Sequence, residues 1–344
     1  MEYIALKDVC RINMGQSPES SSYNESGDGI PFFQGNADFG ERYPVTRIWC
    51  NEPTKIANAG DILISVRAPI GALNYAREVC CIGRGLAAIT PDSSKFSTEF
   101  IYWLLKGKNA ELNSKGTGST FKAIGRKVLE ETMIPDYGFE QQHACAVNLE
   151  KVYAIIQMRR QELLKLDELI KARFVEMFGD PIRNTQNRPT TLFINVVMMQ
   201  RGFDLPVQDR QQNGEIPVFG SNGALDYHNE AKVYGGGVIT GRSGTIGKVY
   251  YTEGDYWPLN TSLFSVDTHG NNIIYLAYLL MLYDLSRFTE GTGVPTLNRN
   301  KFHNKPIIDV PLVEQNKFAA FVAQVDKSKS RKELNYKAKK RLAS

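Results

Sequence analysis

The sequence predicts a mixed α/β fold in which two repeated domains are each followed by a long helix. Three observations lead to this prediction: an ordered set of motifs occurs twice, each set contains short β-branched segments, and residues 140–178 lack both proline and glycine. A chain of 344 residues is long for one compact domain and comfortable for two domains with separate hydrophobic cores.

The duplication is the strongest of these signals, because a repeated order of motifs determines the whole architecture. IPFF at residues 30–33 recurs as IPVF at 216–219, and GDILISVRAPIG at 60–71 recurs as GGVITGRSGTIG at 236–247. Gly-Thr-Gly at 116–118 recurs at 291–293, and a Pro followed by Glu-Gln occurs at 135–141 and again at 311–315. The copies lie 186 positions apart at the first motif (30 to 216) and 175 or 176 at the later ones (67 to 242, 135 to 311), so one loop differs in length by about ten residues.

The elements of each copy follow in the same order. ILISV at 62–66 and GVIT at 237–240 are β-branched runs typical of buried strands. A helical pattern comes next, at about 100–105 in the first copy and 274–283 in the second. The Gly-Thr-Gly loop, a strand ending at proline and a long helix complete each copy.

The first long helix is predicted over residues 140–178, and Gly179-Asp180-Pro181 ends it. Its flanks are strongly charged, which favours an exposed helix with one helical partner over a helix buried along a large core. An apolar residue recurs every seven positions in this helix, at Leu149, Ile156, Leu163, Ile170 and Met177. A second row of the heptad contains the apolar residues Val152 and Leu166, and Arg159 and Arg173 interrupt this row.

The second long helix is predicted from Glu314, where Phe318, Phe321 and Val325 continue a similar apolar seam before it becomes polar. We expect the two helices to pair antiparallel as a coiled-coil spacer and to relate the domains by a pseudo-twofold axis. The expected boundaries are 1–138 and 181–313 for the two domains, 139–180 for the first spacer helix and 314–344 for the shorter second one.

Composition excludes several classes of protein. No apolar stretch is long enough for a transmembrane helix, and the first residues lack the pattern of a signal peptide, so we expect a cytoplasmic protein. The five cysteines contain no CxxC pair and fit neither a disulfide framework nor a zinc site. A net charge of +4 permits a polyanionic partner without requiring one.

Several local strings carry a resemblance to a known family. They are GQSP at 15–18, IPVFGSNG at 216–223, GRSGTIG at 241–247 and FVEMFGDP at 174–181, together with the repeated Gly-Thr-Gly loops and Glu-Gln helix starts. In this order, and across essentially the entire chain, they resemble the specificity subunit of type I restriction-modification systems, which act in phage defence. The second spacer helix is shorter here than the first.

The resemblance implies two target-recognition domains, each of which reads one half of a bipartite site in double-stranded DNA. The helical spacer would dock two methyltransferase subunits that carry S-adenosylmethionine, and the assembly would recruit a restriction subunit that uses ATP. The chain itself would be non-catalytic and hold no cofactor or metal. No membrane partner is expected.

Candidate DNA contacts come from residue types that bind phosphates and base edges. Arg67 and Arg242 follow the two buried strands at matching positions, and Ser243 follows Arg242; a surface arginine in a salt bridge is the plainer interpretation. The Gly-Thr-Gly loops offer backbone amides, hydroxyls and cations, although a plain connecting loop is equally compatible. The loop candidates are Lys115, Thr117, Ser119, Thr120, Lys122, Arg126, Thr292, Asn298, Arg299 and Lys301.

The two short turns after the IPFF and IPVF strands give a weaker signal. They contain Gln34 and Asn36 in the first copy and Ser221 and Asn222 in the second. Amide side chains read adenine well, but such residues also simply favour turns, and the turn interpretation is preferred for all four. The aromatic residues Tyr43, Trp49, Tyr227 and Trp257 are expected to pack in or near the core rather than to stack on bases.

The sequence leaves two alternatives to a DNA-binding specificity subunit. A stand-alone DNA-modifying enzyme is less favoured, because no Asn/Asp-Pro-Pro-Tyr/Phe motif, phosphate-binding loop or metal-ligand cluster occurs in either copy. A protein-binding scaffold with two domains on a helical rod is the other alternative. Salt dependence separates it from a DNA reader, whose affinity falls steeply as salt rises.

Overall fold

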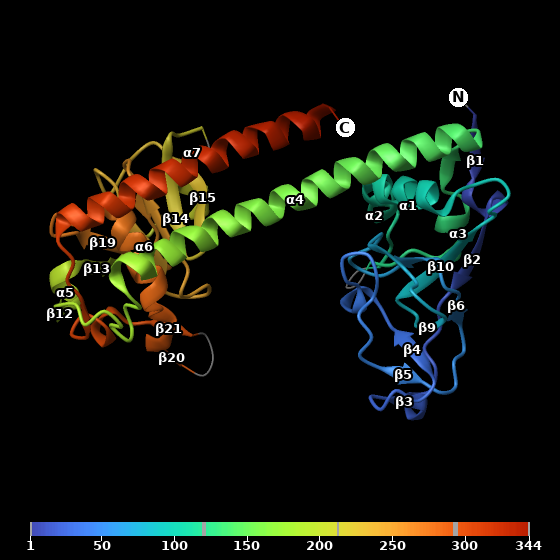
Figure 1. Cartoon of the computed structure of the whole chain (residues 1–344), viewed down its shortest axis with the longest axis horizontal. Helices are drawn as coiled ribbons and strands as arrows, with labels where there is room; N and C mark the ends of the chain where they lie inside the picture. Colours follow the sequence, from blue (N-terminus) through green and yellow to red (C-terminus); the bar gives the residue numbers. More distant parts are fainter. Residues whose placement is uncertain (1, 119–121, 212, 292–294, 343–344) are drawn as a thin grey trace. The chain divides into compact units, whose positions relative to one another are not determined.

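The chain divides into two compact units, Met1–Ile155 and Ile156–Ser344. The structure is a computed structural model that describes residues 2–118, 122–211, 213–291 and 295–342, with side chains up to residue 329. Figure 1 shows the course of the chain through both units and the long helix α4 (Phe139–Phe178), which belongs partly to each.

The first unit contains eleven strands among its described residues: β1 (Tyr3–Ala5), β2 (Cys10–Met14), β3 (Tyr23–Asn24), β4 (Ile30–Phe33), β5 (Trp49–Cys50), β6 (Ile56–Ala57), β7 (Ile62–Ser65), β8 (Leu73–Tyr75), β9 (Cys80–Ile82), β10 (Leu86–Pro91) and β11 (Met133–Pro135). A four-stranded antiparallel sheet has the order β2-β10-β7-β8, and a five-stranded sheet has the order β3-β5-β4-β9-β6 with β4 and β9 parallel. Strands β1 and β11 form a separate antiparallel pair.

Three short helices, α1 (Thr98–Gly107), α2 (Asn109–Ser114) and α3 (Arg126–Glu130), accompany the four-stranded sheet. The β-branched side chains of β7 and the buried face of α1, including Phe100 and Ile101, share one hydrophobic core. The start of α4 joins this unit through Arg42, whose guanidinium pairs with Glu150 and lies 4.8 Å from the ring centroid of Tyr153.

The second unit repeats this plan with the strands β12 (Thr190–Leu192), β13 (Met198–Arg201), β14 (Ile216–Gly220), β15 (Gly223–His228), β16 (Gly237–Gly241), β17 (Val249–Thr252), β18 (Trp257–Pro258), β19 (Ser262–Asp267), β20 (Thr289–Glu290), β21 (Thr296–Leu297) and β22 (Pro306–Ile308). Its helices are α5 (Phe193–Val196), α6 (Ile273–Tyr283) and α7 (Leu312–Leu342). The mixed α/β class, the predicted buried strands and the two predicted helical patterns are confirmed.

The duplication seen in the sequence is also present in the sheets. The order β13-β19-β16-β17 matches β2-β10-β7-β8 strand for strand, and the pair β12-β22 matches β1-β11. The parallel pair β14-β18 matches β4-β9. These equivalent strands therefore pair in the same way in both copies. The segments that follow β4 and β14 differ, because Asn36–Asp38 forms a short 3-10 helix whereas Gly223–His228 forms the strand β15.

Within the second unit, the last turns of α4 pack antiparallel against α7 (Figure 1). Phe174 lies edge-on to Phe318 with ring centroids 5.3 Å apart, Arg173 lies over Phe321, and Asp167 accepts a hydrogen bond from Lys329 at 2.6 Å. Residue numbers in these contact pairs therefore rise along α4 as they fall along α7, which is the pattern of antiparallel helices. The buried side chains on this face are Ile170, Phe174, Phe178, Phe318, Val322 and Val325.

The heptad seam predicted for α4 is only partly correct. Ile170 is fully buried, but Leu149 at the start of the seam has an exposed fraction of 38%. Phe174 and Phe178, which lie off the predicted seam, are fully buried against Tyr275 of α6 as well as against α7. This end of α4 therefore buries a wide helical face rather than a narrow seam.

Candidate nucleic-acid interface

The candidate arginine of the first unit lies directly beside the Gly-Thr-Gly loop. Arg67 follows β7 and forms an isolated antiparallel bridge with Ala123, and Ala123 pairs in turn with Thr117 through two hydrogen bonds of 3.0 and 2.9 Å. The amide of Ala68 donates to the carbonyl of Lys122 at 3.0 Å. The backbone thus holds the exposed Arg67, Thr117 and Lys122 in one small region of the surface.

The second unit builds the same corner. Arg242 follows β16, its carbonyl accepts a hydrogen bond from the amide of Leu297 at 2.8 Å, and Ser243 forms a bridge with Thr296. The Arg242 guanidinium donates to the carbonyl of Asn260 at 3.2 Å, which leaves most of its donors available. In both units, therefore, the arginine after the buried strand meets the segment that follows the Gly-Thr-Gly loop.

Other candidate cations lie near these corners but have acidic neighbours. Lys115 pairs with Glu111 at 2.7 Å, Arg126 with Glu130 at 3.5 Å and Lys301 with Glu290 at 2.7 Å. Exposed pairs of this kind contribute little energy and exchange partners readily, so they do not prevent a phosphate contact. The candidates Ser119, Thr120 and Thr292 lie outside the described residues.

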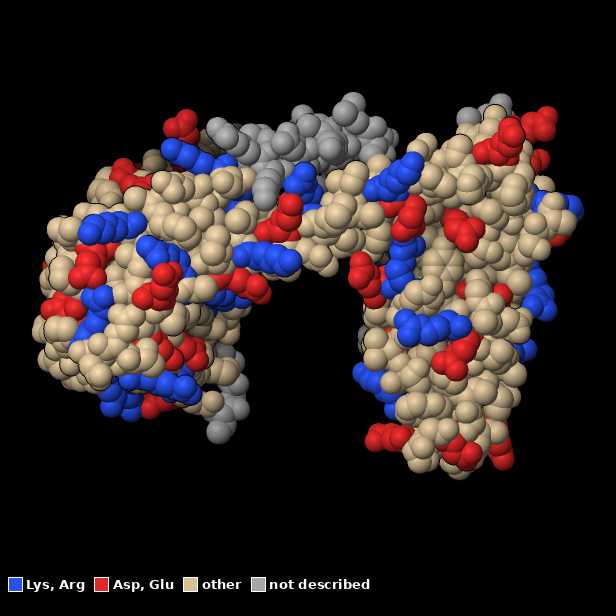
Figure 2. Space-filling view, in the orientation of Figure 1, with Lys and Arg blue, Asp and Glu red and all other residues tan. Residues whose placement is uncertain are grey.

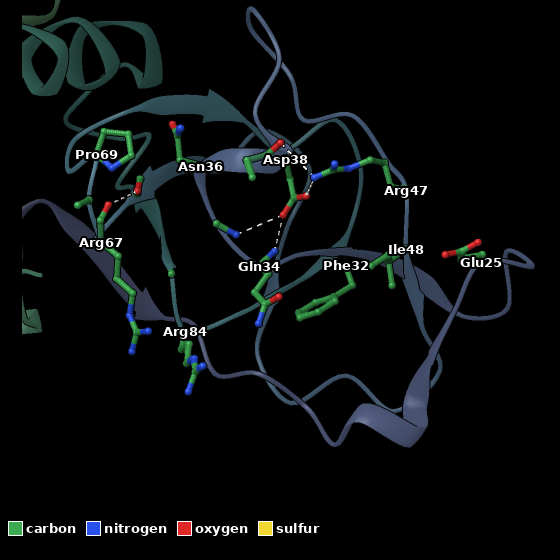
Figure 3. A pocket seen from close by; sticks show the side chains of 15 residues that line it. Glu25, Phe32, Gln34, Asn36, Asp38, Arg47, Ile48, Arg67, Pro69 and Arg84 are labelled. Carbon is green, nitrogen blue, oxygen red and sulfur yellow. Dashed lines mark hydrogen bonds and ion pairs between the residues drawn. The ribbon is translucent and has the colours of Figure 1, made fainter. Parts of the chain in front are cut away.

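A hollow of about 730 Å³ lies beside the corner of the first unit. Figure 3 shows that the side chains of Arg67, Arg84 and Gln34 extend in the same direction, whereas Asn36 points away from them. Neither arginine forms an ion pair with a side chain that the structure describes, so the surface-salt-bridge interpretation of Arg67 finds no support. Two amide-bearing turn residues thus line the same hollow as two available guanidinium groups.

A smaller hollow of about 350 Å³ lies at the corner of the second unit. Its lining includes Arg201, Arg242 and Arg299, together with the amide side chains of Asn298 and Asn300. Among the residues that the structure describes, no carboxylate lines it and none forms an ion pair with these arginines. Three guanidinium groups around one hollow, with no carboxylate among the described residues that line it, suit a phosphate or another anion.

The turn residues of the second unit behave differently from those of the first. The side-chain oxygen of Asn222 accepts hydrogen bonds from Lys248 at 3.2 Å and from the Tyr250 hydroxyl at 3.4 Å. Neither Ser221 nor Asn222 lines the hollow beside Arg242. Their position therefore favours the turn interpretation, whereas Gln34 and Asn36 do line the hollow of their unit.

Two further arginines that line these hollows, Arg84 and Arg201, were not predicted from the sequence. Each occurs in one copy only, so the comparison of the repeats gave no signal for either. Flanking glycines at 83 and 85 were an available signal for Arg84, since paired glycines often mark a close backbone approach. Of the aromatic residues expected to pack in or near the core, Trp257 is buried and Trp49 is partly buried. Tyr43 is partly exposed but packs against Tyr75 and Arg77, whereas Tyr227 is half exposed.

Charge outside the hollows is mixed. In the view of Figure 2, acidic and basic side chains alternate over both units. No group of metal-ligating side chains is present in the described part of the chain, and none of its helices is long and apolar enough to cross a membrane. The arginine corners and their hollows therefore stand in a surface of mixed charge, without an extended basic patch in this view.

Comparison with known proteins gives a family for this arrangement. Residues 1–168 and 196–339 match the family described as "Type I restriction modification DNA specificity domain". The chain is 42% identical over 161 residues to a Methanocaldococcus jannaschii protein named "type I restriction enzyme MjaX specificity subunit", a match that covers 47% of this chain and 38% of that protein. It is 26% identical over 194 residues to the MjaIX specificity subunit of the same organism, covering 53% and 45% of the two chains.

A solved structure supports the fold over a longer span. The type I restriction-modification system S subunit from M. genitalium matches 98% of this chain and 92% of its own, with a TM-score of 0.56 and 15% sequence identity. The chain matches less than half of the length of the two curated relatives. Because the family match covers both units, the chain belongs to the family of type I restriction-modification DNA specificity domains.

Proposed function

We propose that this chain is the DNA-binding specificity subunit of a type I restriction-modification complex, in which each unit reads one half of a bipartite site. The observation that carries the proposal is the repeated corner, where Arg67 or Arg242 meets the segment after a Gly-Thr-Gly loop. A reader of two half-sites needs two equivalent binding surfaces. The duplicated fold supplies them, with arginines available for phosphates or guanine edges.

The long helices support an antiparallel spacer, formed by residues 139–180 and 314–344, between recognition domains 1–138 and 181–313. Antiparallel contacts between α4 and α7, such as Phe174 against Phe318, are consistent with this role. Along α4, apolar side chains including Met158, Leu164 and Leu169 are exposed, which suits a protein partner. We assign that surface to two methyltransferase subunits, with a restriction subunit joining the assembly in the cytoplasm.

Catalysis in this proposal belongs to the partners. The candidate residues supply cations, amides and hydroxyls, which bind DNA but provide no nucleophile or cofactor site. The purified chain, given S-adenosylmethionine and DNA, is therefore expected to transfer no methyl group and to cut no DNA. Methylation by the chain alone would overturn this assignment and favour the stand-alone enzyme.

The test of the main proposal is a methylome of cells with and without the gene. We expect one bipartite methyladenine motif to disappear when the gene is absent. Exchange of residues 181–313 for the equivalent domain of another such protein should then change one half of the motif only. A change in both halves, or in neither, would contradict the assignment of one half-site to each domain.

A protein-binding scaffold is the second candidate, and the exposed apolar side chains of α4 favour it. The two functions differ in their response to salt. A DNA reader should lose affinity for duplex DNA linearly in a double-logarithmic plot against salt, with a slope set by the number of phosphates contacted. Absence of any DNA binding at low salt would leave the scaffold as the better description.

A further inference from the structure

The backbone of Gln34 is held in place from two sides. Its amide and that of Gly35 donate to the Asp38 carboxylate at 2.7 and 3.2 Å, and its carbonyl accepts a hydrogen bond from the amide of Gly85 at 3.1 Å. Arg47 pairs with the other oxygen of Asp38. A surface turn fixed in this way presents its side chain from a defined position.

Glycines allow this close approach. A Cβ at Gly85 would lie 2.4 Å from the carbonyl oxygen of Gln34, and one at Gly83 would lie 3.0 Å from its Cα. Any larger residue at 85 would therefore push the two segments apart. The Gly83-Arg84-Gly85 segment thus serves two purposes: it fixes the Gln34 backbone, and it places Arg84 beside the same hollow.

The side chain of Gln34 is exposed, and no hydrogen bond to its amide is found among the described residues. Figure 3 shows this amide extending in the same direction as the guanidinium groups of Arg67 and Arg84. An amide has one donor and one acceptor end, which match N7 and the N6 amino group of adenine in the major groove. The two flanking cations suit the neighbouring phosphates or a guanine.

We propose that Gln34 is a specificity-determining residue that reads an adenine in the half-site bound by the first unit. Asp38 is a positioning residue that acts through the Gln34 backbone and does not touch the DNA. The inference rests on the proposed function, because it needs a chain that selects DNA sequence. It goes beyond that function by assigning one base contact to one side chain.

The experiment is a binding selection with the full chain on duplexes in which both half-sites are randomised. The wild-type chain should select a bipartite sequence, and exchange of residues 181–313 identifies the half that the first unit reads. Gln34→Ala should lower the preference for adenine at one position of that half by about tenfold or more, and leave the other half unchanged. Gln34→Glu should shift the same position toward cytosine, whose N4 amino group a carboxylate accepts.

Three further variants separate base reading from general damage to the fold. Gln141→Ala removes an exposed glutamine from the same unit and should leave every base preference unchanged. Asp38→Ala should weaken selection at the same position as Gln34→Ala, a result that mere destabilisation would not produce. Thermal unfolding of Gln34→Ala should match that of the wild type, since the side chain is exposed and makes no described hydrogen bond.

The outcomes are distinguishable. If the wild-type chain selects sequence and Gln34→Ala keeps every base preference, or lowers affinity equally for all sequences, the inference is overturned while the proposed function stands. If the wild-type chain selects no sequence at low salt, the proposed function fails and the inference fails with it. Loss of one adenine preference in one half-site supports both.

Discussion

Gln142 and Gln315 make two matching hydrogen bonds in two different units. Each is fully buried in the first turns of a long helix, and its side-chain oxygen accepts the amide at the N-terminus of the covering helix, Ser97 in one unit and Asn272 in the other, at 2.9 and 2.8 Å. Each side-chain nitrogen donates to a carbonyl just before its own helix, that of Tyr137 or Val310. The glutamines thus join each long helix to its unit.

Replacement of either glutamine by alanine should destabilise its own unit. The substitution leaves a partly buried backbone amide and a carbonyl without these partners, and an unsatisfied group of this kind costs about 1–3 kcal/mol when it is buried. We therefore expect Gln142→Ala to lower the unfolding free energy of the first unit by about 2–4 kcal/mol, and Gln315→Ala to do the same for the second. Urea unfolding, followed by circular dichroism and by a probe in each unit, measures both effects.

Gln141→Ala is the matched control, because Gln141 lies next to Gln142 but is exposed. It should change stability by less than about 0.5 kcal/mol. If Gln141→Ala and Gln142→Ala changed the unfolding free energy equally, the hydrogen bonds of Gln142 would not be the cause of the loss of stability. The alignment of the repeated sequences pairs Gln141 with Gln315. The hydrogen bonds show instead that Gln142 is the residue equivalent to Gln315.

Local pattern was sufficient to predict the duplication, the buried strands and the covering helices. Each motif, strand and helix of the repeat is a run of residues close in sequence, such as the β-branched 62–66 segment, which contains β7. The predicted arginines Arg67 and Arg242 also occupy equivalent places in their units, each beside the segment that follows a Gly-Thr-Gly motif. Their contact could not be predicted, because Arg67 and Ala123 are brought together only by the packing of a whole unit.

Packing also explains why the heptad prediction for α4 was incomplete. A period of seven selects one seam, and Phe174 and Phe178 do not belong to it. The last part of α4 contacts both α6 and α7, as the stacking of Phe174 on Tyr275 and its edge contact with Phe318 show. Because α6 and α7 both pack on this end of α4, the buried face of the helix is wider than a coiled-coil seam. The helical period of 3.6 residues therefore describes its apolar positions better than a period of seven.

Arginines of the second hollow should bind DNA phosphates rather than bases. Three cations that line one hollow attract the phosphate backbone of any sequence. The double variant Arg242→Ala/Arg299→Ala should weaken binding to all duplexes alike, and it should reduce the slope of log K against log salt by about 1–2. Fluorescence anisotropy at several salt concentrations gives the slope for specific and unrelated duplexes.

Arg183→Ala is a control that removes one positive charge from an exposed position of the second unit outside the lining of the hollow. Its effect on the slope should be small. If the double variant changed base preference at one position while the salt slope stayed constant, a base contact would replace the phosphate contact proposed here.

The cysteines should differ sharply in reactivity. Burial raises the pKa of the Cys10 and Cys80 thiols to about 12 and that of Cys81 to about 11, so almost no reactive thiolate is present at neutral pH. Cys50 is fully buried, and Cys145 on α4 is partly exposed. A thiol reagent should therefore modify one cysteine in the native chain and all five after denaturation.

Mass spectrometry of the labelled peptides should find the label on Cys145, and Cys145→Ser should remove the native reaction. Fast labelling of Cys80 in the folded chain would contradict the buried environment described for the first unit. The experiment also reports on partner binding, because a methyltransferase subunit that covers this part of α4 should protect Cys145.

His303 should make the stability of the second unit depend on pH. Its Nε2 accepts the amide of Met199 at 3.2 Å, a bond that only an unprotonated nitrogen can accept, and both burial and the nearby positive Arg299 lower its pKa below 6.5. The unfolded chain therefore takes up the proton first as pH falls. The contribution of His303 to stability is present in full above about pH 6.5 and is lost as pH falls from there through the lowered pKa of the folded unit.

His303→Gln keeps a hydrogen-bond acceptor but does not titrate, so its urea midpoints should vary less between pH 7.5 and 5 than those of the wild type. His143→Gln in the first unit should follow the wild type. Parallel pH profiles for wild type and His303→Gln would show that His303 does not carry the effect.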